Sequence, residues 1–285
     1  MNWTSIAINI GIVLYILTIL AIIYTIILEN RNPVRTLAWI LVLVLAPGVG
    51  LFFYIYFGMN YRKIKMFSMK GLGDFKWLQY MSEDQKQRIK KAELLKKEDM
   101  EAVKPLMTLL LNNSKALLSR NNTIEILNNG EATFGSIFKA IAKAKKYIHL
   151  EYYIIDKGEL GEKLKELLIA KAKEGVEVRV IYDDVGSWKL PKRYIKEMQA
   201  AGIQIYPFLP VRFPLFTNKV NYRNHRKIVV VDGDTGFIGG LNFADRYLHG
   251  LPGIGIWRDT HLKVKGEAVT SLQVVFLFDW YFVRQ

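Results

Sequence analysis

The sequence predicts an α/β sandwich with a mixed, largely parallel sheet, preceded by a two-helix transmembrane hairpin. From residue 122 onward, β-branched and aromatic runs alternate with amphipathic segments, which is typical of a sheet covered by helices. Before that point, two long stretches carry no charged side chain, as a membrane-crossing helix requires. The 285 residues therefore divide into a predicted hairpin over 1–60, a basic helical linker over 61–121 and a lobe over 122–285.

The hairpin is predicted from the charge pattern of the first sixty residues. Residues 4–28 are uncharged, a polar turn follows at 29–35, and residues 36–57 are uncharged again. Each stretch matches the ~20 apolar residues that cross a bilayer. A cleaved signal peptide would have a basic start and a small-residue cleavage site, and the first stretch lacks both. We therefore expect two membrane helices joined by a short turn.

Basic residues define the expected orientation and partner. Four follow the second stretch at once, namely Arg62, Lys63, Lys65 and Lys70, whereas the turn holds two arginines. The positive-inside rule places the lobe in the cytoplasm. The net charge of +14 indicates an anionic partner, and the apolar stretches favour acidic membrane lipids over nucleic acid.

The linker and the lobe differ in composition. Residues 75–120 are rich in Lys, Glu, Gln and Leu, which predicts one or two solvated helices without chemistry. The lobe has predicted strands at 123–127, 147–154, 176–182, 228–231 and 235–238, and predicted helices at 133–145 and 160–173. His149 and Glu151 alternate on one strand face, and we expect a hydrogen-bonded support there rather than an acid/base pair.

No metal site or other cofactor is predicted. The chain has no cysteine and four scattered histidines, so no thiolate or zinc-type cluster can be assembled from sequence spacing. Asp183 and Asp184 directly follow a predicted strand, where turn residues are more common than metal ligands.

The chemistry is concentrated between residues 221 and 242. His225 stands two residues before Lys227, so both side chains leave the same face of an extended segment. The buried strand that follows ends at Asp232, and paired glycines then let a backbone approach a ligand beside Asn242, whose amide is a donor. Histidine, lysine and asparagine at one sheet end predict a cradle for a phosphate group.

The pattern His-x-Lys-x4-Asp at 225–232, followed by Gly-Gly-x-Asn at 239–242, resembles the signature of the phospholipase D superfamily. Segments at 148–154, 171–186 and 201–202 resemble bacterial cardiolipin synthases more narrowly. A second His-x-Lys pair, His261 and Lys263, has Ala268 at the aspartate position and does not complete the pattern.

The resemblance implies a phospholipase D-like lobe, phosphodiester exchange without a cofactor, and a place in the bacterial inner membrane. It implies His225 as the nucleophile, with Lys227 and Asn242 binding the phosphate. Asp232 belongs to the implied catalytic motif, although its position after a strand favours a role in fixing the turn. Asp259 is the candidate that orients the histidine, because superfamily members use a carboxylate after the main motif in this way.

The implied reaction joins two phosphatidylglycerol molecules. His225 attacks phosphorus and displaces glycerol, and a hydroxyl of the second lipid then attacks the phosphohistidine to give cardiolipin. Water in place of that hydroxyl would give phosphatidic acid.

The sequence departs from the family in carrying one His-x-Lys-x4-Asp motif where full-length cardiolipin synthases carry two. It ends inside a predicted helix that begins near Glu267 and has no stop signal. We therefore expect a truncated chain that is weakly active or inactive by itself. Two alternatives stay open: a homodimeric single-motif phospholipase D or nuclease in the membrane, and a non-catalytic membrane-bound remnant.

Overall fold

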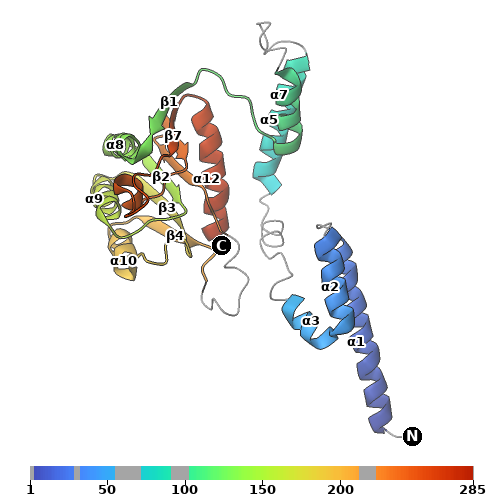
Figure 1. The fold of residues 1–285 in the computed structure, drawn as a ribbon. Helices are drawn as coiled ribbons and strands as arrows, with labels where there is room; N and C mark the ends of the chain where they lie inside the picture. Colours follow the sequence, from blue (N-terminus) through green and yellow to red (C-terminus); the bar gives the residue numbers. More distant parts are fainter. Residues whose placement is uncertain (1–2, 29–32, 55–71, 91–102, 212–222, 285) are drawn as a thin grey trace. The chain divides into compact units, whose positions relative to one another are not determined.

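A computed structural model describes residues 3–28, 33–54, 72–90, 103–211 and 223–284 (Figure 1). Helices α1 to α3 belong to one compact unit, and the later helices and all the strands belong to a second. The basic residues predicted to face lipid, Arg62, Lys63, Lys65 and Lys70, lie outside the described residues.

The first unit contains α1 (Trp3–Leu28), α2 (Pro33–Leu45) and α3 (Pro47–Phe53). A proline can begin a helix because its missing N–H would have no partner there, which explains why Pro47 starts α3 and divides the second uncharged stretch. Trp39 and Tyr54 pack edge to face at 5.6 Å. None of the helices in the described segments is both long and apolar enough to cross a membrane. The transmembrane hairpin thus stays a prediction.

Two helices occupy the linker region, α5 (Leu72–Lys90) and α7 (Lys104–Ser114). Ile89 and Leu111 are buried against one another, and the Ser82 hydroxyl donates to the Leu111 carbonyl at 3.0 Å. The Gln85 amide accepts from Leu118 N at 2.8 Å and donates to Leu118 O at 2.9 Å. The prediction of helices in this region is confirmed.

The lobe is built on a seven-stranded sheet in the order β1-β7-β6-β5-β2-β3-β4. The strands are β1 (Thr123–Asn128), β2 (Tyr147–Tyr152), β3 (Glu177–Asp183), β4 (Gln204–Phe208), β5 (Lys227–Val231), β6 (Thr235–Gly239) and β7 (Thr260–Lys265). Strands β2, β3 and β4 run parallel, and the other neighbouring pairs are antiparallel.

The sheet is therefore mixed as predicted, but the prediction that it is largely parallel is wrong. A parallel pair needs a crossover, which α9 and α10 supply between β2, β3 and β4. The connection between β5 and β6 has three residues, Asp232 to Asp234, and such a turn can join only antiparallel strands.

Helices cover both faces of the sheet, which confirms the α/β/α sandwich (Figure 1). One face packs against α8 (Asn129–Ala142), α9 (Glu159–Lys173) and α10 (Lys192–Ala200), and the other against α12 (Ala268–Arg284). In β5, Val229 and Val231 join the first core while Ile228 and Val230 face α12. Burial on both faces explains why this strand is an unbroken apolar run.

Candidate active site

His225 lies just before β5, beside the C-terminal end of β2. Its exposed imidazole stacks on the ring of Tyr153, with centroids 4.1 Å apart and planes inclined by 19°. Lys227 is buried, its Nζ donates to the His225 carbonyl at 2.6 Å, and it lies 5.3 Å from the centre of the same tyrosine ring. The predicted placement of histidine and lysine on one face is confirmed, and Tyr153 is the platform that the sequence did not identify.

The ammonium group of Lys227 places a partly desolvated positive charge beside the histidine. Burial lowers the pKa of Lys227, and the negative charge of Asp259 opposes this shift. Asp259 therefore lies near the ammonium group. A lysine flanked in this way offers a fixed cation to a phosphate oxygen.

Asp259 is held by the backbone around it. Its Oδ1 accepts from Thr260 N at 2.7 Å, and its own N–H donates to Asn129 Oδ1 at 3.2 Å. Within residues 223–284 the His225 ring has no hydrogen-bond partner, so the structure brings Asp259 toward Lys227 rather than onto the imidazole. The orienting role of Asp259 stays a prediction.

His261 is a further histidine near the site, and sequence reasoning dismissed it as part of an incomplete motif. It is fully buried, and neither ring nitrogen has a hydrogen-bond partner among the described residues. Burial, with a smaller contribution from the Lys227 charge, lowers the pKa of His261 to about 4. It is therefore neutral at physiological pH.

The paired glycines lie against two polar side chains, and the predicted approach of their backbone to a ligand stays a prediction. A Cβ on Gly239 would lie 2.3 Å from His261 Nδ1, and one on Gly240 would lie 2.3 Å from Asp259 Oδ1. Gly239 pairs with His261 across the β6–β7 ladder. The glycines thus make room for His261 of β7 and for Asp259, which directly precedes that strand. A glycine opposite a histidine is the signal that could have identified His261.

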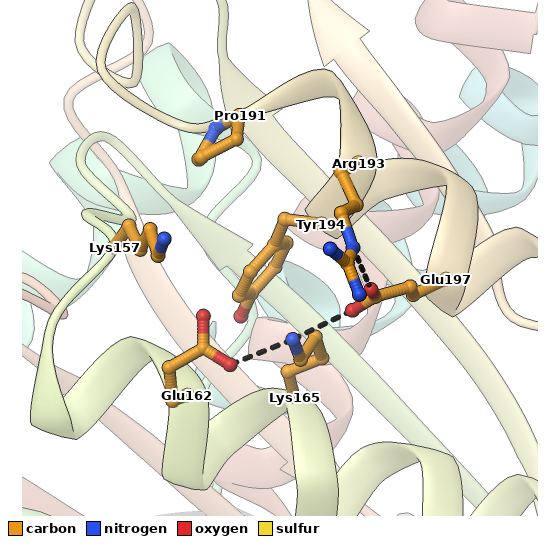
Figure 2. A pocket seen from close by; sticks show the side chains of 7 residues that line it. All are labelled: Lys157, Glu162, Lys165, Pro191, Arg193, Tyr194 and Glu197. Carbon is orange, nitrogen blue, oxygen red and sulfur yellow. Dashed lines mark hydrogen bonds and ion pairs between the residues drawn. The ribbon is translucent and has the colours of Figure 1, made fainter.

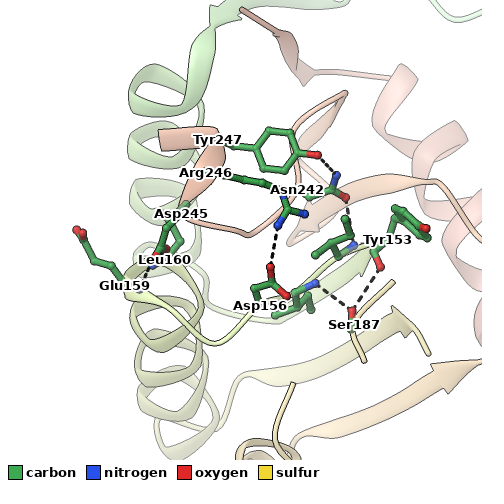
Figure 3. A network of polar contacts seen from close by, with 11 residues as sticks. Tyr153, Asp156, Glu159, Leu160, Ser187, Asn242, Asp245, Arg246 and Tyr247 are labelled. Atoms are coloured by element: carbon green, nitrogen blue, oxygen red, sulfur yellow. Dashed lines mark hydrogen bonds and ion pairs between the residues drawn. The ribbon is translucent and has the colours of Figure 1, made fainter. Parts of the chain in front are cut away.

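Asn242 belongs to a polar network that fixes the segment bearing Tyr153 (Figure 3). Its Oδ1 accepts from Ile154 N at 3.1 Å, and its Nδ2 donates to the Tyr247 hydroxyl at 2.8 Å. Ser187 Oγ accepts from Ile155 N at 3.0 Å and donates to Tyr153 O at 3.3 Å. The carboxamide thus holds the backbone next to the platform. Its Nδ2 carries a second hydrogen, and its predicted binding of a phosphate stays a prediction.

The same network caps α9. Asp245 accepts from the backbone N–H groups of Glu159 and Leu160, each at 2.9 Å, and Arg246 pairs with Asp156 at 3.0 Å (Figure 3). A carboxylate at a helix N-terminus satisfies donors that have no partner within the helix. The loop after β6 is therefore anchored to the connection between β2 and α9.

Asp232 lies at the opposite end of β5 from His225. Its carboxylate accepts from the backbone N–H groups of Lys145, Lys146 and Tyr147 at 2.8, 2.7 and 2.9 Å, and its φ of 54° is left-handed. Burial raises the pKa of Asp232, but these hydrogen bonds outweigh it, so the pKa lies below its ordinary value. It is seven residues from the histidine along an extended segment, which separates the two by roughly 20 Å. These contacts give Asp232 the turn-fixing role, and its prediction as a catalytic group stays a prediction.

Polar groups also lie behind the motif, on the α12 side. Asp183 is fully buried, accepts from Asn224 N at 2.9 Å and pairs with Arg223 at 3.2 Å. It also accepts from Gly186 N at 2.8 Å, as the predicted turn role requires. The predicted support role of His149 agrees with its place, stacked on Phe276 at 4.5 Å. In the described segments no group of three or more potential ligands could hold a metal ion.

A cavity of about 220 Å³ between α9 and α10 contains none of the predicted site residues (Figure 2). Its charges satisfy one another: Lys165 pairs with Glu162 at 2.6 Å and Glu197 at 2.7 Å, and Arg193 pairs with Glu197 at 2.7 Å. The Tyr194 hydroxyl donates to Gly161 O at 2.7 Å. These contacts join the two helices, and the predicted catalytic residues lie elsewhere, at the start of β5.

Comparison with known proteins identifies two matching families. Residues 137–269 match the family described as "Cardiolipin synthase, PLD-like domain", and residues 16–58 match "Phospholipase_D-nuclease N-terminal". The chain is 46% identical over 266 residues to a cardiolipin synthase of Geobacillus sp. (strain WCH70), covering 93% of this chain and 52% of that one. It is 48% identical over 259 residues to cardiolipin synthase 2 of Bacillus cereus (strain ATCC 14579), covering 90% and 49%.

The chain therefore spans about half the length of the curated relatives it matches. A solved phosphatidylserine synthase from Haemophilus influenzae Rd KW20 aligns with a TM-score of 0.44 and 22% identity, over 55% of this chain and 36% of that one.

Proposed function

Because this chain belongs to the phospholipase D superfamily and carries its cardiolipin synthase type of domain, we propose that it performs phosphatidyl transfer between two phosphatidylglycerol molecules. The products are cardiolipin and glycerol. The observation that carries the proposal is the cluster at the start of β5, where an exposed imidazole lies on Tyr153 beside the buried ammonium of Lys227.

In the first step, a neutral ring nitrogen of His225 attacks phosphorus. The N–P bond forms as the bond between phosphorus and the glycerol oxygen breaks, and that oxygen takes a proton from a general acid. Lys227 and the Asn242 amide neutralise charge on the non-bridging oxygens, and a preorganised cation of this kind is worth about a hundredfold or more in rate. The carboxylate of Asp259, which lies near that ammonium, stabilises the cationic phosphohistidine.

In the second step, a hydroxyl of another phosphatidylglycerol attacks the same phosphorus. The N–P bond breaks, the new P–O bond forms, and the hydroxyl proton goes to the group that served as acid. We assign that group to a second histidine, supplied by another lobe of the same type or by a second copy of this chain. A water molecule attacking at this step would yield phosphatidic acid.

The N-terminal helices are proposed to hold the lobe at the cytoplasmic face of the bacterial inner membrane. In support, α1 and α2 expose large apolar side chains to their surroundings, among them Trp3 at 81%, Leu20 at 56% and Leu45 at 74%. Since the chain has no cysteine, single cysteines introduced by Asn30→Cys, in the predicted turn at 29–35, and by Glu174→Cys can report sidedness. A membrane-impermeant maleimide applied to whole cells should leave position 174 unlabelled.

The function is tested with the full chain in vesicles of radiolabelled phosphatidylglycerol. We expect labelled cardiolipin at the low rate predicted for a chain with one motif, which His225→Ala abolishes and His249→Ala preserves. His249 is a matched control because it is an exposed histidine that pairs with Glu159, at 3.1 Å, away from the β5 cluster. Cleavage of DNA with no lipid product would favour the homodimeric nuclease, and lipid composition unaffected by His225→Ala would favour the non-catalytic remnant.

A further inference from the structure

The two residues that flank His225 are both anchored to a buried pair of carboxyl groups. Asn224 is 3% exposed, and its Nδ2 donates to Glu151 Oε1 and, at 3.3 Å, to Asp279 Oδ2. Arg226 forms an ion pair with Asp279 through its NH1 group. The Asn224 Oδ1 also accepts from Arg226 N at 3.1 Å.

These anchors come from two elements that the motif itself does not include. Glu151 lies on β2, where it faces α12, and Asp279 lies in the last turns of α12. Side chains alternate along an extended segment, so residues 224 and 226 point toward α12 while 225 and 227 point toward Tyr153. The nucleophile is thus fastened on both sides from the face opposite to the one it uses.

The two carboxyl groups cannot both be charged at low cost. Glu151 is 1% exposed and Asp279 is 6% exposed, and the groups that face them are the guanidinium of Arg226 and the amide of Asn224. Burial, followed by the charge of Asp279, raises the pKa of Glu151 well above its ordinary value, and Arg226 only partly opposes the shift. One cation with one carboxylate and one protonated carboxyl is the balanced state.

We propose that Glu151 and Asp279 share one proton and act as positioning residues, which hold Asn224 and Arg226 and thereby fix the His225 imidazole over Tyr153. The inference rests on the proposed function for its kinetic readout alone, because the position of the ring can be measured without turnover. It assigns a role to α12, an element that contributes no group to the β5 cluster described above.

The kinetic test compares Glu151→Gln with Glu151→Leu in the full chain. A glutamine carbonyl accepts from Asn224 and its amide donates to Asp279, so it reproduces a protonated glutamate, and we expect kcat within about threefold of the parent. Leucine fills similar space but leaves the Asn224 amide and Asp279 without this partner. We expect kcat to fall by about tenfold or more with KM unchanged, because the ring is misplaced while lipid binding persists.

A matched control is Glu125→Gln, which changes an exposed strand glutamate paired with Lys263 at 2.8 Å. It should leave kcat unchanged. If Glu151→Gln loses as much activity as Glu151→Leu, the shared proton is wrong, because a charged carboxylate would then be what the site needs.

The second readout is the His225 Hε1 signal in a ¹H–¹³C spectrum, which is simple to assign because the chain has four histidines. Stacking on Tyr153 shifts this proton upfield, and Glu151→Leu should move it toward its free-histidine position while Glu151→Gln leaves it in place. An unchanged signal in Glu151→Leu would overturn the proposal even if no lipid is turned over. Absence of turnover in the parent with the predicted signal shifts would instead contradict the proposed function alone.

The pH dependence of the His225 Hε1 signal tests whether Glu151 and Asp279 share a proton. As pH rises above the ordinary glutamate range, the parent must lose the proton and two carboxylates then repel, so the Hε1 signal should drift. Glu151→Gln cannot lose that proton, so the difference between the two signals, in which the pH response common to both proteins cancels, should appear only as the parent loses it. A drift of equal size in both proteins would contradict the proposal.

Discussion

The two ends of β5 carry residues of one sequence motif, but these residues have different surroundings and different roles. At the start of the strand, His225 is exposed on Tyr153 with Lys227 beside it, and the ring makes no hydrogen bond to any described residue. At the far end, Asp232 accepts three backbone hydrogen bonds that close the connection between α8 and β2. One end leaves its polar groups available to a substrate, and the other uses them within the fold.

The difference shows that the spacing His-x-Lys-x4-Asp reflects the length of a strand as well as a reaction. A five-residue strand must end in a turn, and the left-handed φ of Asp232 is tolerated best by aspartate, asparagine and glycine. Mutations at the two ends should therefore separate cleanly into effects on rate and effects on stability.

The largest expected effect is at the start of β5. Lys227→Met keeps the apolar stem and removes the charge, so we expect kcat to fall by about a hundredfold to a thousandfold. The free energy of unfolding should change little, because a buried ammonium is exchanged for an apolar group. Steady-state kinetics on phosphatidylglycerol vesicles with thermal unfolding checks both. Lys263→Met, at a half-buried position of β7 that pairs with Glu125, is the control with unchanged kcat.

The far end of β5 should show the reverse. Asp232→Ala leaves three backbone donors without their acceptor and places alanine at a positive φ, so we expect a loss of about 2–3 kcal/mol of stability. The kcat per folded molecule should stay within about twofold of the parent. Urea unfolding gives the first quantity and active-site titration the second. A loss of kcat comparable to that of Lys227→Met would return Asp232 to the catalytic group.

The pH dependence of the Asp232 contribution follows from the sign of its shift. Its pKa is lowered on folding, so the ionised carboxylate stabilises the protein above the ordinary aspartate pKa of about 4 and this contribution is lost as pH falls through the folded pKa. The stability difference between the parent and Asp232→Asn should be constant from pH 5 to 7 and shrink below about pH 4. A difference that grows on acidification would contradict this assignment.

The smallest effect is expected at Gly240, near the start of β5 in space. An added Cβ would meet the Asp259 carboxylate at 2.3 Å, and that side chain can turn away. Gly240→Ala should therefore reduce kcat by only about threefold to tenfold, through the displaced charge near Lys227, with little change in unfolding. If Gly240→Ala leaves kcat unchanged, the position of the Asp259 charge does not affect the contribution of Lys227 to catalysis.

The sequence was informative wherever local pattern and chemistry agreed. Strands β1, β2, β3, β5 and β6, helices α8, α9 and α12, the shared face of His225 and Lys227 and the turn role of Asp232 follow from periodicity and turn residues. Strands β4 and β7 and helix α10 were not predicted. The relative direction of the strands could not be predicted in this way. A strand that is buried on both faces is a continuous apolar run whether its neighbours are parallel or antiparallel. Here the short Asp232–Asp234 turn was the available signal.

The partners of the site could not be predicted from the sequence because they come together only in the fold. Tyr153, His261 and Asp279 lie on three different elements, and no spacing rule connects them with residue 225. Asn242 was predicted from its donor chemistry alone, without knowledge that its two polar atoms would also contact Ile154 and Tyr247. Burial and hydrogen-bond partners are properties of the tertiary structure.

The most direct test of the central claim is to trap the intermediate in the full chain. Vesicles containing phosphatidylglycerol are mixed with protein, the reaction is quenched at alkaline pH where an N–P bond survives, and the peptide containing residue 225 is analysed by mass spectrometry. We predict a phosphatidyl adduct on His225 in the parent and in Asp232→Ala, and none in His225→Ala. Cardiolipin formation without an adduct on His225, or an adduct on another residue, would contradict the account.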